Sequence, residues 1–242
     1  MNVTITDSYD AMSRAAADVI AATVTENPHC NLGLATGSTP IGLYADLVRD
    51  YDDGIISFAD VTTFNLDEYR GLDPDHDQSY RYFMNKNLFD LVNIDTAATH
   101  VPDGANPDAD AACAAYEQAI AAAGGVDLQL LGLGHNGHIG FNEPCDHFPV
   151  DTHVVKLTES TINANSRLFD SAEDVPREAY TMGIGTIMRA KKILVVASGA
   201  DKAQIVHDAF FGPVTPEVPA SVLQLHPDVT VIVDAEAGAL CK

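Results

Sequence analysis

A mostly apolar run from Val126 to Leu133, which stops at closely spaced glycines, is the feature that most constrains how this chain can fold. A short apolar run of this kind is typical of a buried strand, and the glycines indicate a turn at its carboxyl end. Ligands of open α/β sheets bind at the carboxyl ends of the strands. Three polar residues follow this end: Asn136, His138 and Glu143. The sequence therefore predicts that a carboxamide, an imidazole and a carboxylate converge there on one small molecule.

Strand and helix patterns alternate along the rest of the chain. Apolar runs predict further strands at residues 30–35, 61–66, 153–157, 180–184, 192–197 and 229–233. Helical spacing and capping residues predict helices at residues 8–26, 41–48, 106–123, 158–169, 186–190 and 202–210, the third with Asn106 as its N-cap. The alternation predicts an α/β fold with a doubly wound, mostly parallel, Rossmann-like sheet and helices on both faces. Because no linker or composition break divides the chain, residues 1–242 are expected to form a single domain.

A second glycine turn follows the predicted strand at residues 30–35. It contains Thr36, Gly37, Ser38, Thr39 and Pro40. Ser38 or Thr39 is expected to cap the next helix, and Pro40 suits its first turn. A helix amino terminus after such a turn offers backbone N–H groups to an anion, although plain capping would explain the same residues. A Walker A loop is excluded because no G-K-[ST] follows.

A third polar group, Asp67, follows the predicted strand at residues 61–66, so it should share one rim with His138 and Glu143. A histidine with a pKa of about 6.5 can pass protons at neutral pH, and a nearby carboxylate can orient it. Desolvation in a closed pocket raises the pKa of an aspartate and makes it a usable carbon-acid base. The set suits proton transfer on a phosphorylated sugar. The alternative interpretation is that Asp67 and Glu143 are solvated loop acids and His138 is a structural group.

The charge balance restricts the partners of this chain. Its 35 acidic and 13 basic residues give a formal net charge of -22, which disfavours nucleic acid and anionic membranes. A bound phosphate must therefore be held by local cations, and Arg167 and Lys202 are the candidates. The alternative interpretation is that both are surface residues without a function. A solvated acidic surface also suits concentrated salt, where the Debye length falls to about 3 Å. This suggests a salt-adapted, halophilic protein.

Cofactor, metal and membrane sites find little support in the sequence. Residues 132–137 match G-x-G-x-x-G, but the residues that follow are poor helix formers, so no dinucleotide is expected. His135 and His138 lack a clustered third ligand, and the four cysteines lack C-x-x-C spacing, so no metal is expected either. No apolar run approaches the roughly 20 residues that cross a bilayer, and the first 20 residues do not resemble a signal peptide. A cytoplasmic protein is expected.

Several separated motifs also resemble those of the glucosamine-6-phosphate deaminases, over nearly the whole chain. They are LATGSTP at 34–40, NLDEY at 65–69, His76 with Ser79 and Tyr80, GLGHNGHIGFNEP at 132–144, NSR at 165–167, and LQLH at 223–226. The resemblance implies conversion of glucosamine 6-phosphate and water into fructose 6-phosphate and ammonia, without a redox cofactor or an obligatory metal. Whether galactosamine 6-phosphate is also accepted stays open.

The resemblance also implies roles for individual residues. His138 would open the sugar ring with help from Glu143 and Asn136, and Asp67 would move a proton from C2 to C1. The phosphate would rest on Thr36, Gly37, Ser38 and Thr39, with charge from Arg167 and Lys202.

Two features depart from the family pattern. Many members carry an aspartate where this chain has Asn136, which can hydrogen-bond but cannot share a proton or a negative charge. The longer, hexameric members carry an allosteric site with basic residues in the segment that corresponds to residues 146–157. Here that segment has only Lys156, His147 and His153, and the chain ends at Lys242. A non-allosteric monomer or small homo-oligomer is therefore expected.

Two other functions compete with this one. A 6-phosphogluconolactonase has a related sheet and a similar turn, but the NEP ending and the DEY motif resemble the deaminases instead. A sugar-phosphate sensor would carry a helix-turn-helix and a basic face, and the sequence indicates neither.

Overall fold

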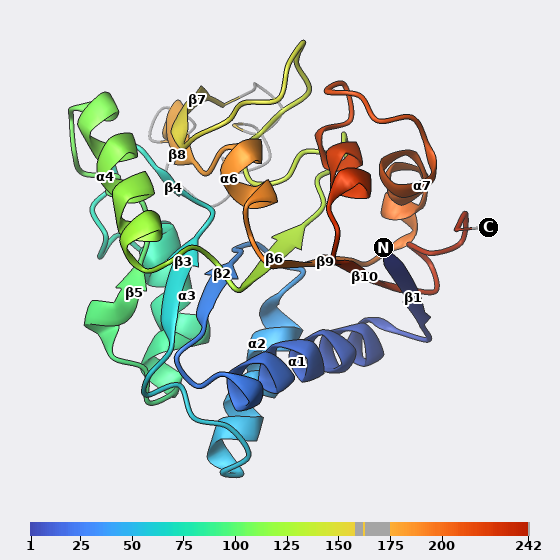
Figure 1. Ribbon diagram of the computed structural model, residues 1–242, viewed down its shortest axis with the longest axis horizontal. Helices are drawn as coiled ribbons and strands as arrows, with labels where there is room; N and C mark the ends of the chain where they lie inside the picture. The colour runs from blue at the N-terminus through green and yellow to red at the C-terminus, as the bar shows by residue number, and fades with distance from the viewer. Residues whose placement is uncertain (158–161, 163–174, 242) are drawn as a thin grey trace.

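A seven-stranded parallel sheet forms the middle layer of the protein (Figure 1). The computed structural model describes residues 1–157, 162 and 175–241. The strand order is β1-β10-β9-β6-β2-β3-β5, and every adjacent pair is parallel. The strands are β1 (Asn2–Thr6), β2 (Asn31–Leu34), β3 (Thr62–Asn65), β5 (Thr99–His100), β6 (Leu128–Gly132), β9 (Lys192–Ala197) and β10 (Val229–Asp234). This confirms the predicted doubly wound α/β fold.

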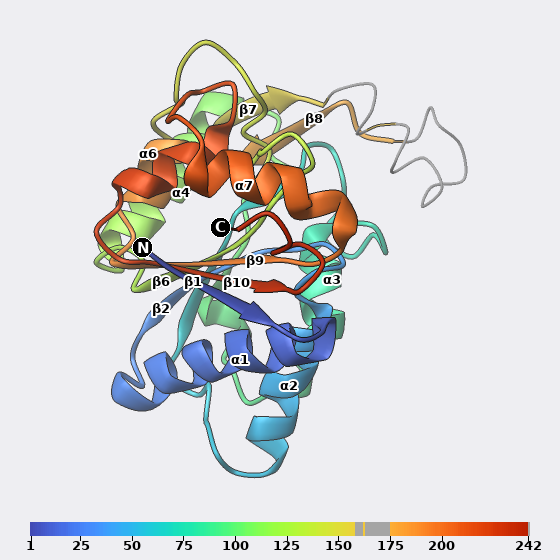
Figure 2. The same cartoon turned by 90° about the vertical axis from the view of Figure 1, so that its right-hand side faces the viewer.

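Helices cover both faces of this sheet, as a buried parallel sheet requires (Figure 2). The helices α1 (Tyr9–Glu26) and α2 (Ile41–Asp52) pack together on one face, and α6 (Ile184–Met188) and α7 (Ala203–Phe211) lie on the other. Elsewhere the described residues form α3 (Tyr80–Asn87) and α4 (Ala109–Ala122), with short 3-10 turns at Phe89–Leu91, Thr96–Ala98, Ala200–Lys202 and Pro219–Leu225. The central strands are fully buried, because residues such as Leu130, Leu131 and Val195 pack between the two helical layers. Among the helices of the described residues, none is long and apolar enough to cross a membrane.

The direction in which successive strands are added to the sheet reverses between β2 and β6. From β2 the chain continues through β3 to β5 on one side, and it then returns to β6 on the other side and continues through β9 to β10. A crevice forms at such a switch point, outside the carboxyl ends of the strands. The two glycine turns, after Leu34 and after Gly132, both lie there.

A second, antiparallel sheet of three short strands was not predicted. It has the order β4-β8-β7, with β4 at Asp67–Tyr69, β7 at His153–Lys156 and β8 at Glu178–Thr181. The expected strand at 180–184 thus ends at Thr181, and α6 begins at Ile184 instead of residue 186. A small apolar cluster that includes Tyr69 and Phe141 packs against this sheet. The predicted helix at 158–169 falls almost entirely on residues outside the described part of the chain.

Two predicted helix caps were wrong. The N-cap of α4 is Asp108, whose Oδ1 accepts the Ala111 N–H at 3.1 Å. The Asn106 side chain accepts the N–H of Asp108 and so lies outside the helix. The N-cap of α2 is Pro40, without a side-chain cap bond from Ser38 or Thr39. The hydroxyl of Tyr9 on α1 takes the place of a side-chain cap. It accepts the Gly42 N–H at 2.9 Å and donates to the Thr39 carbonyl at 3.1 Å.

Candidate active site

A cavity of about 270 Å³ opens at the switch point between β2 and β6. Its wall includes residues from both glycine turns, from the end of β3 and from the turn before α7: Thr36, Gly37, Ser38, Thr39, Asp67, Tyr80, Gly134, His135, His138, Gly140, Phe141 and Lys202. The structure therefore brings together the predicted anion turn, Asp67, His138 and Lys202. Asn136 and Glu143 lie behind His138, and Arg167 falls outside the described residues.

The imidazole of His138 has a defined orientation. Its Nδ1 lies 2.8 Å from Asn136 Oδ1, and Asn136 Nδ2 lies 2.5 Å from Glu143 Oε2. Because an amide nitrogen must donate to a carboxylate, Asn136 Oδ1 is the acceptor and His138 Nδ1 carries the proton. This leaves His138 Nε2, which lies against Gly134 of the cavity wall, as the atom that can exchange a proton with a ligand.

Glu143 completes this relay. Its Oε1 lies 3.4 Å from His138 Nδ1. Burial on its own would raise the pKa of Glu143, but the hydrogen bonds and charge of His138 and the hydrogen bond from Asn136 hold that pKa below its ordinary value. The carboxylate therefore stays ionised at neutral pH beside the His138 ring.

Asp67 lines the same cavity and is only 6% exposed. Desolvation, together with the neighbouring charge of Glu68, raises the pKa of Asp67 to about 8. Gly140 allows the loop to pass close to it, since a Cβ there would lie 3.5 Å from Asp67 Oδ2 and 2.8 Å from Thr181 Oγ1. A buried carboxyl group with this proton affinity can both remove and return a proton near neutral pH.

The Thr36–Thr39 turn and the cation Lys202 line the same cavity. Lys202 Nζ donates to the Leu133 carbonyl at 2.8 Å, and burial lowers the pKa of Lys202. Asp234, at the end of β10, holds the turn that precedes Lys202, because its carboxylate accepts hydrogen bonds from Ser198 Oγ and the Gly199 N–H. A partly desolvated ammonium ion beside a glycine turn can hold a phosphate.

Two aromatic residues of the wall were missed as site residues. Tyr80 and Phe141 stack with ring centroids 6.1 Å apart, and both line the cavity. Tyr80 is the first residue of α3, after its N-cap Ser79. The family motifs at residues 79–80 and 132–144 contain both residues, but nothing in the local pattern places α3 beside β4.

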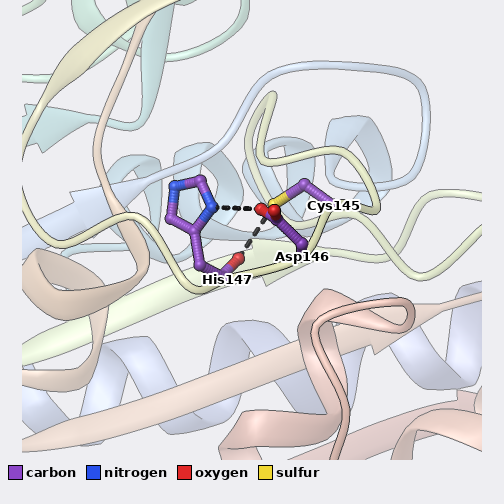
Figure 3. Close-up of side chains that lie close together, drawn as sticks. All are labelled: Cys145, Asp146 and His147. Atoms are coloured by element: carbon purple, nitrogen blue, oxygen red, sulfur yellow. Dashed lines mark hydrogen bonds and ion pairs between the residues drawn. The ribbon is translucent and has the colours of Figure 1, made fainter.

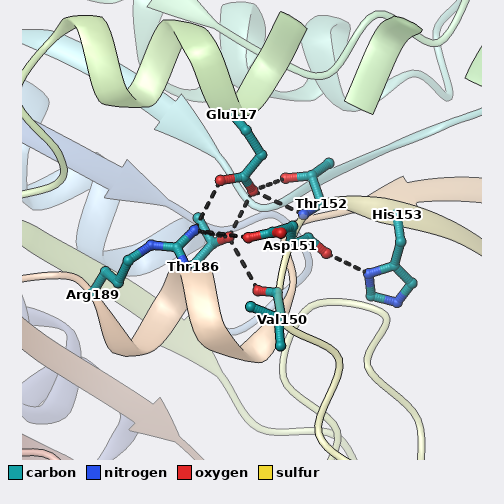
Figure 4. Close-up of polar contacts among 7 residues, drawn as sticks. All are labelled: Glu117, Val150, Asp151, Thr152, His153, Thr186 and Arg189. Atoms are coloured by element: carbon teal, nitrogen blue, oxygen red, sulfur yellow. Dashed lines mark hydrogen bonds and ion pairs between the residues drawn. The ribbon is translucent and has the colours of Figure 1, made fainter. Parts of the chain in front are cut away.

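A larger cavity of about 570 Å³ shares Phe141 with the site and is also lined by Glu143. The loop at residues 144–152 forms much of its wall, and Glu117 of α4 anchors that loop (Figure 4). Glu117 Oε1 accepts the Thr152 N–H at 2.8 Å and the hydroxyls of Thr152 and Thr186 at 2.6 Å each, and its Oε2 pairs with Arg189 at 2.9 Å. These bonds and the Arg189 charge hold the pKa of Glu117 below its ordinary value, although burial opposes them.

Three possible metal ligands lie together at the start of the same loop (Figure 3). The ligand atoms of Cys145, Asp146 and His147 lie within 4.8 Å of one another. Cys145 Sγ donates to the His147 carbonyl at 2.8 Å, and His147 Nδ1 lies 2.7 Å from Asp146 Oδ1. Because Asp146 and His147 are largely exposed and the polar atoms already bond one another, the geometry is that of a surface loop.

Comparisons with known proteins agree with this geometry. Residues 5–232 match the family described as glucosamine-6-phosphate isomerases/6-phosphogluconolactonase. The glucosamine-6-phosphate deaminases of Thermoanaerobacter pseudethanolicus and Clostridium perfringens strain 13 are each 54% identical to this chain, over 99% and 100% of it and over 95% and 100% of their own lengths.

Solved structures give the same result. The structure of a monomeric glucosamine-6-phosphate deaminase superposes with a TM-score of 0.95 at 45% identity, covering 99% of this chain and 100% of that one. A 6-phosphogluconolactonase from Trypanosoma cruzi superposes with a TM-score of 0.79 at 19% identity, covering 98% of this chain and 96% of that one. The second likeness shows a shared fold.

Proposed function

The chain belongs to the family of glucosamine-6-phosphate isomerases and 6-phosphogluconolactonases, and we propose that it converts glucosamine 6-phosphate and water into fructose 6-phosphate and ammonia. One observation carries this choice within the family: a buried aspartate with a raised pKa faces the same cavity as an oriented imidazole. Moving a proton between two carbons needs such a base, whereas attack of water on a lactone carbonyl does not.

Ring opening is assigned to His138. Its Nε2 takes the proton of the C1 hydroxyl and returns a proton to the ring oxygen, which breaks the bond between C1 and that oxygen and leaves an open-chain aldehyde. Glu143 and Asn136 hold the imidazole in the tautomer that this transfer requires. Such general acid-base steps contribute about 100- to 10,000-fold in rate.

Isomerisation and loss of ammonia follow. As the Asp67 carboxylate removes the C2 proton, the C1 oxygen takes up a proton from water, which gives an enolamine. Asp67 then delivers its proton to C1 and the amino group gives up one proton to water, so that C2 becomes an imine. Water adds to C2, the C–N bond breaks, and ammonia leaves the ketose product. Net C–N bond cleavage therefore consumes one water, as in a hydrolase.

The substrate phosphate is assigned to the Thr36–Thr39 turn and Lys202. All five residues line the same cavity as Asp67, which supports this assignment. Arg167 is retained as a second cation from the sequence motif.

We also assign the chain to the cytoplasm as a salt-adapted monomer. Its acidic composition and the likeness to a monomeric deaminase support this assignment.

Parallel assays test the proposal. Ammonia release is measured from glucosamine 6-phosphate and galactosamine 6-phosphate, and lactone hydrolysis is measured with 6-phosphogluconolactone. Ammonia release from at least one amino sugar phosphate is expected, with no catalysed lactone hydrolysis. Lactone hydrolysis without ammonia release would replace the deaminase assignment with the lactonase.

A further inference from the structure

Glu68 is a second buried carboxylate directly beside Asp67, and the reaction above makes no use of it. It lies on β4 and is only 3% exposed. Its Oε1 accepts the N–H groups of Tyr69 at 2.8 Å and Tyr80 at 2.9 Å, and its Oε2 accepts the N–H of Arg81 at 2.9 Å. Burial raises the pKa of Glu68, and the three main-chain donors and the charge of Arg81 oppose that rise by stabilising the ionised form.

These bonds join β4 to the start of α3. Tyr80 and Arg81 are the first two residues of that helix, where unpaired N–H groups and the helix dipole favour a negative charge. The Tyr80 ring lines the cavity, so the position of Glu68 sets how this wall stands relative to Asp67. Gly104 packs behind the carboxylate, because a Cβ there would lie 3.0 Å from Glu68 Cγ and 2.3 Å from the Tyr69 carbonyl oxygen.

The charges around Asp67 give Glu68 a second effect. Tyr80 of α3 and Tyr116 of α4 face Asp67, but burial raises the pKa of both well above the ordinary value, so both stay neutral. His135, His138 and Lys202 line the cavity, and Arg81 lies behind Glu68 with its guanidinium bound to Thr99. The negative charge of Glu68 acts on Asp67, and its repulsion adds to desolvation in raising the pKa of Asp67.

We propose that Glu68 is a positioning residue for the base Asp67: its carboxylate locks β4 to the start of α3, and its negative charge opposes ionisation of Asp67. The base thereby keeps enough proton affinity to remove the C2 proton and to return it at C1. This inference rests on the proposed deaminase function for its meaning in catalysis. Its physical content, the coupling of two carboxyl groups, can be measured without turnover.

The experiment titrates the Asp67 carboxyl by infrared difference spectroscopy, with Asp67→Asn to assign the band, in wild type, Glu68→Gln and Glu68→Asp. In Glu68→Gln the midpoint should fall by about one pH unit, a tenfold change in the ionisation constant. The acid limb of kcat/KM should move with it. Glu68→Asp keeps the charge but is one methylene shorter, so its midpoint should stay and its kcat should fall.

Glu178→Gln on β8 is the matched control. Glu178 pairs with Arg70 on the same small sheet, and its neutralisation should move neither the midpoint nor kcat. An unchanged midpoint in Glu68→Gln, or wild-type kcat in Glu68→Asp, overturns the proposal. If Glu68→Gln does not fold, Glu68→Asp decides, since a midpoint that drops with the charge retained also contradicts it. Absence of ammonia release from wild type would count against the deaminase function and would leave the titration result standing.

Discussion

At the scale of single residues, the His138 ring occupies the space that a side chain at position 134 would fill, so a glycine is required there. A Cβ at Gly134 would lie 2.3 Å from the His138 ring, which is closer than any real contact, whereas a Cβ at Gly132 would meet nothing within 4 Å. Gly134→Ala should therefore push the imidazole out of line and lower kcat/KM by about 100-fold or more. Steady-state ammonia release measures this. Wild-type activity in Gly134→Ala would contradict the assigned orientation of His138.

Asp67 gives a prediction about isotope exchange and pH. Asp67→Asn should leave substrate binding largely intact while abolishing hydrogen exchange at C2, which NMR in deuterated water can follow. A base acts in its ionised form, so kcat/KM of the wild type should rise with pH as Asp67, with a pKa of about 8, loses its proton. Exchange that persists in the variant, or an acid limb near pH 4, would remove Asp67 from the role of base.

The same raised pKa has a consequence for stability. Because the folded-state pKa of Asp67 lies above its unfolded value, its contribution to stability is fully present below the unfolded pKa and is lost as pH rises to about 8. Asp67→Asn does not titrate. The difference in unfolding free energy between variant and wild type should therefore shift in favour of the variant between pH 5 and pH 9. Urea unfolding at both pH values measures it, and a difference independent of pH would show that Asp67 is ionised throughout.

The sequence predicted these site residues unequally, for a physical reason. Asp67, His138 and the Thr36–Thr39 turn follow apolar strands, so their meeting at one rim follows from the parallel sheet alone. Glu68 and Tyr80 could not be placed this way, because their contact depends on how α3 packs against β4. That packing arises from contacts that no local pattern encodes.

At the scale of the elements, Glu117 ties α4 to α6 and to the loop at residues 144–152 (Figure 4). Glu117→Gln should lower the free energy of unfolding by about 1 to 3 kcal/mol, because it removes the charge from four hydrogen bonds. Its folded-state pKa is depressed, so this contribution is present above the unfolded pKa and is lost as pH falls through the folded value. Urea unfolding at pH 7 and at acid pH tests both statements.

Glu26→Gln at the exposed carboxyl end of α1 is the control for Glu117→Gln. It should change stability by no more than about 0.5 kcal/mol. If the two substitutions cost the same at pH 7, the contacts of Glu117 do not anchor the loop.

Elements were predictable where burial leaves a continuous apolar run, as in β6, β9 and β10. The edge strand β1 was missed because its residues are mostly exposed and carry no apolar run. The short strand β5 was missed because two residues give no period. The small antiparallel sheet joins β4 with β7 and β8 from much later in the chain, and such pairings depend on tertiary contacts.

At the scale of the whole molecule, the topology itself places the site. The reversal between β2 and β6 sets two glycine turns side by side, and β3 delivers Asp67 next to them. The Thr36–Thr39 turn and the turn that carries the imidazole therefore both lie at the only reversal of strand order in the seven-stranded sheet of the described residues.

The net charge of -22 also acts on the molecule as a whole. Self-repulsion opposes the compact state, and added salt screens it as the Debye length falls from about 30 Å at 0.01 M to about 3 Å at 1 M. Salt also weakens surface ion pairs such as Lys191 with Asp127, but exposed pairs contribute only about 0 to 1 kcal/mol each. With 35 acidic and 13 basic residues, relief of repulsion should dominate. The Tm should therefore rise from 0.01 M to 1 M sodium chloride, with most of the gain at low salt. Sucrose at matched osmolality separates screening from preferential exclusion, and a Tm that is flat or falls with salt would contradict a salt-adapted surface.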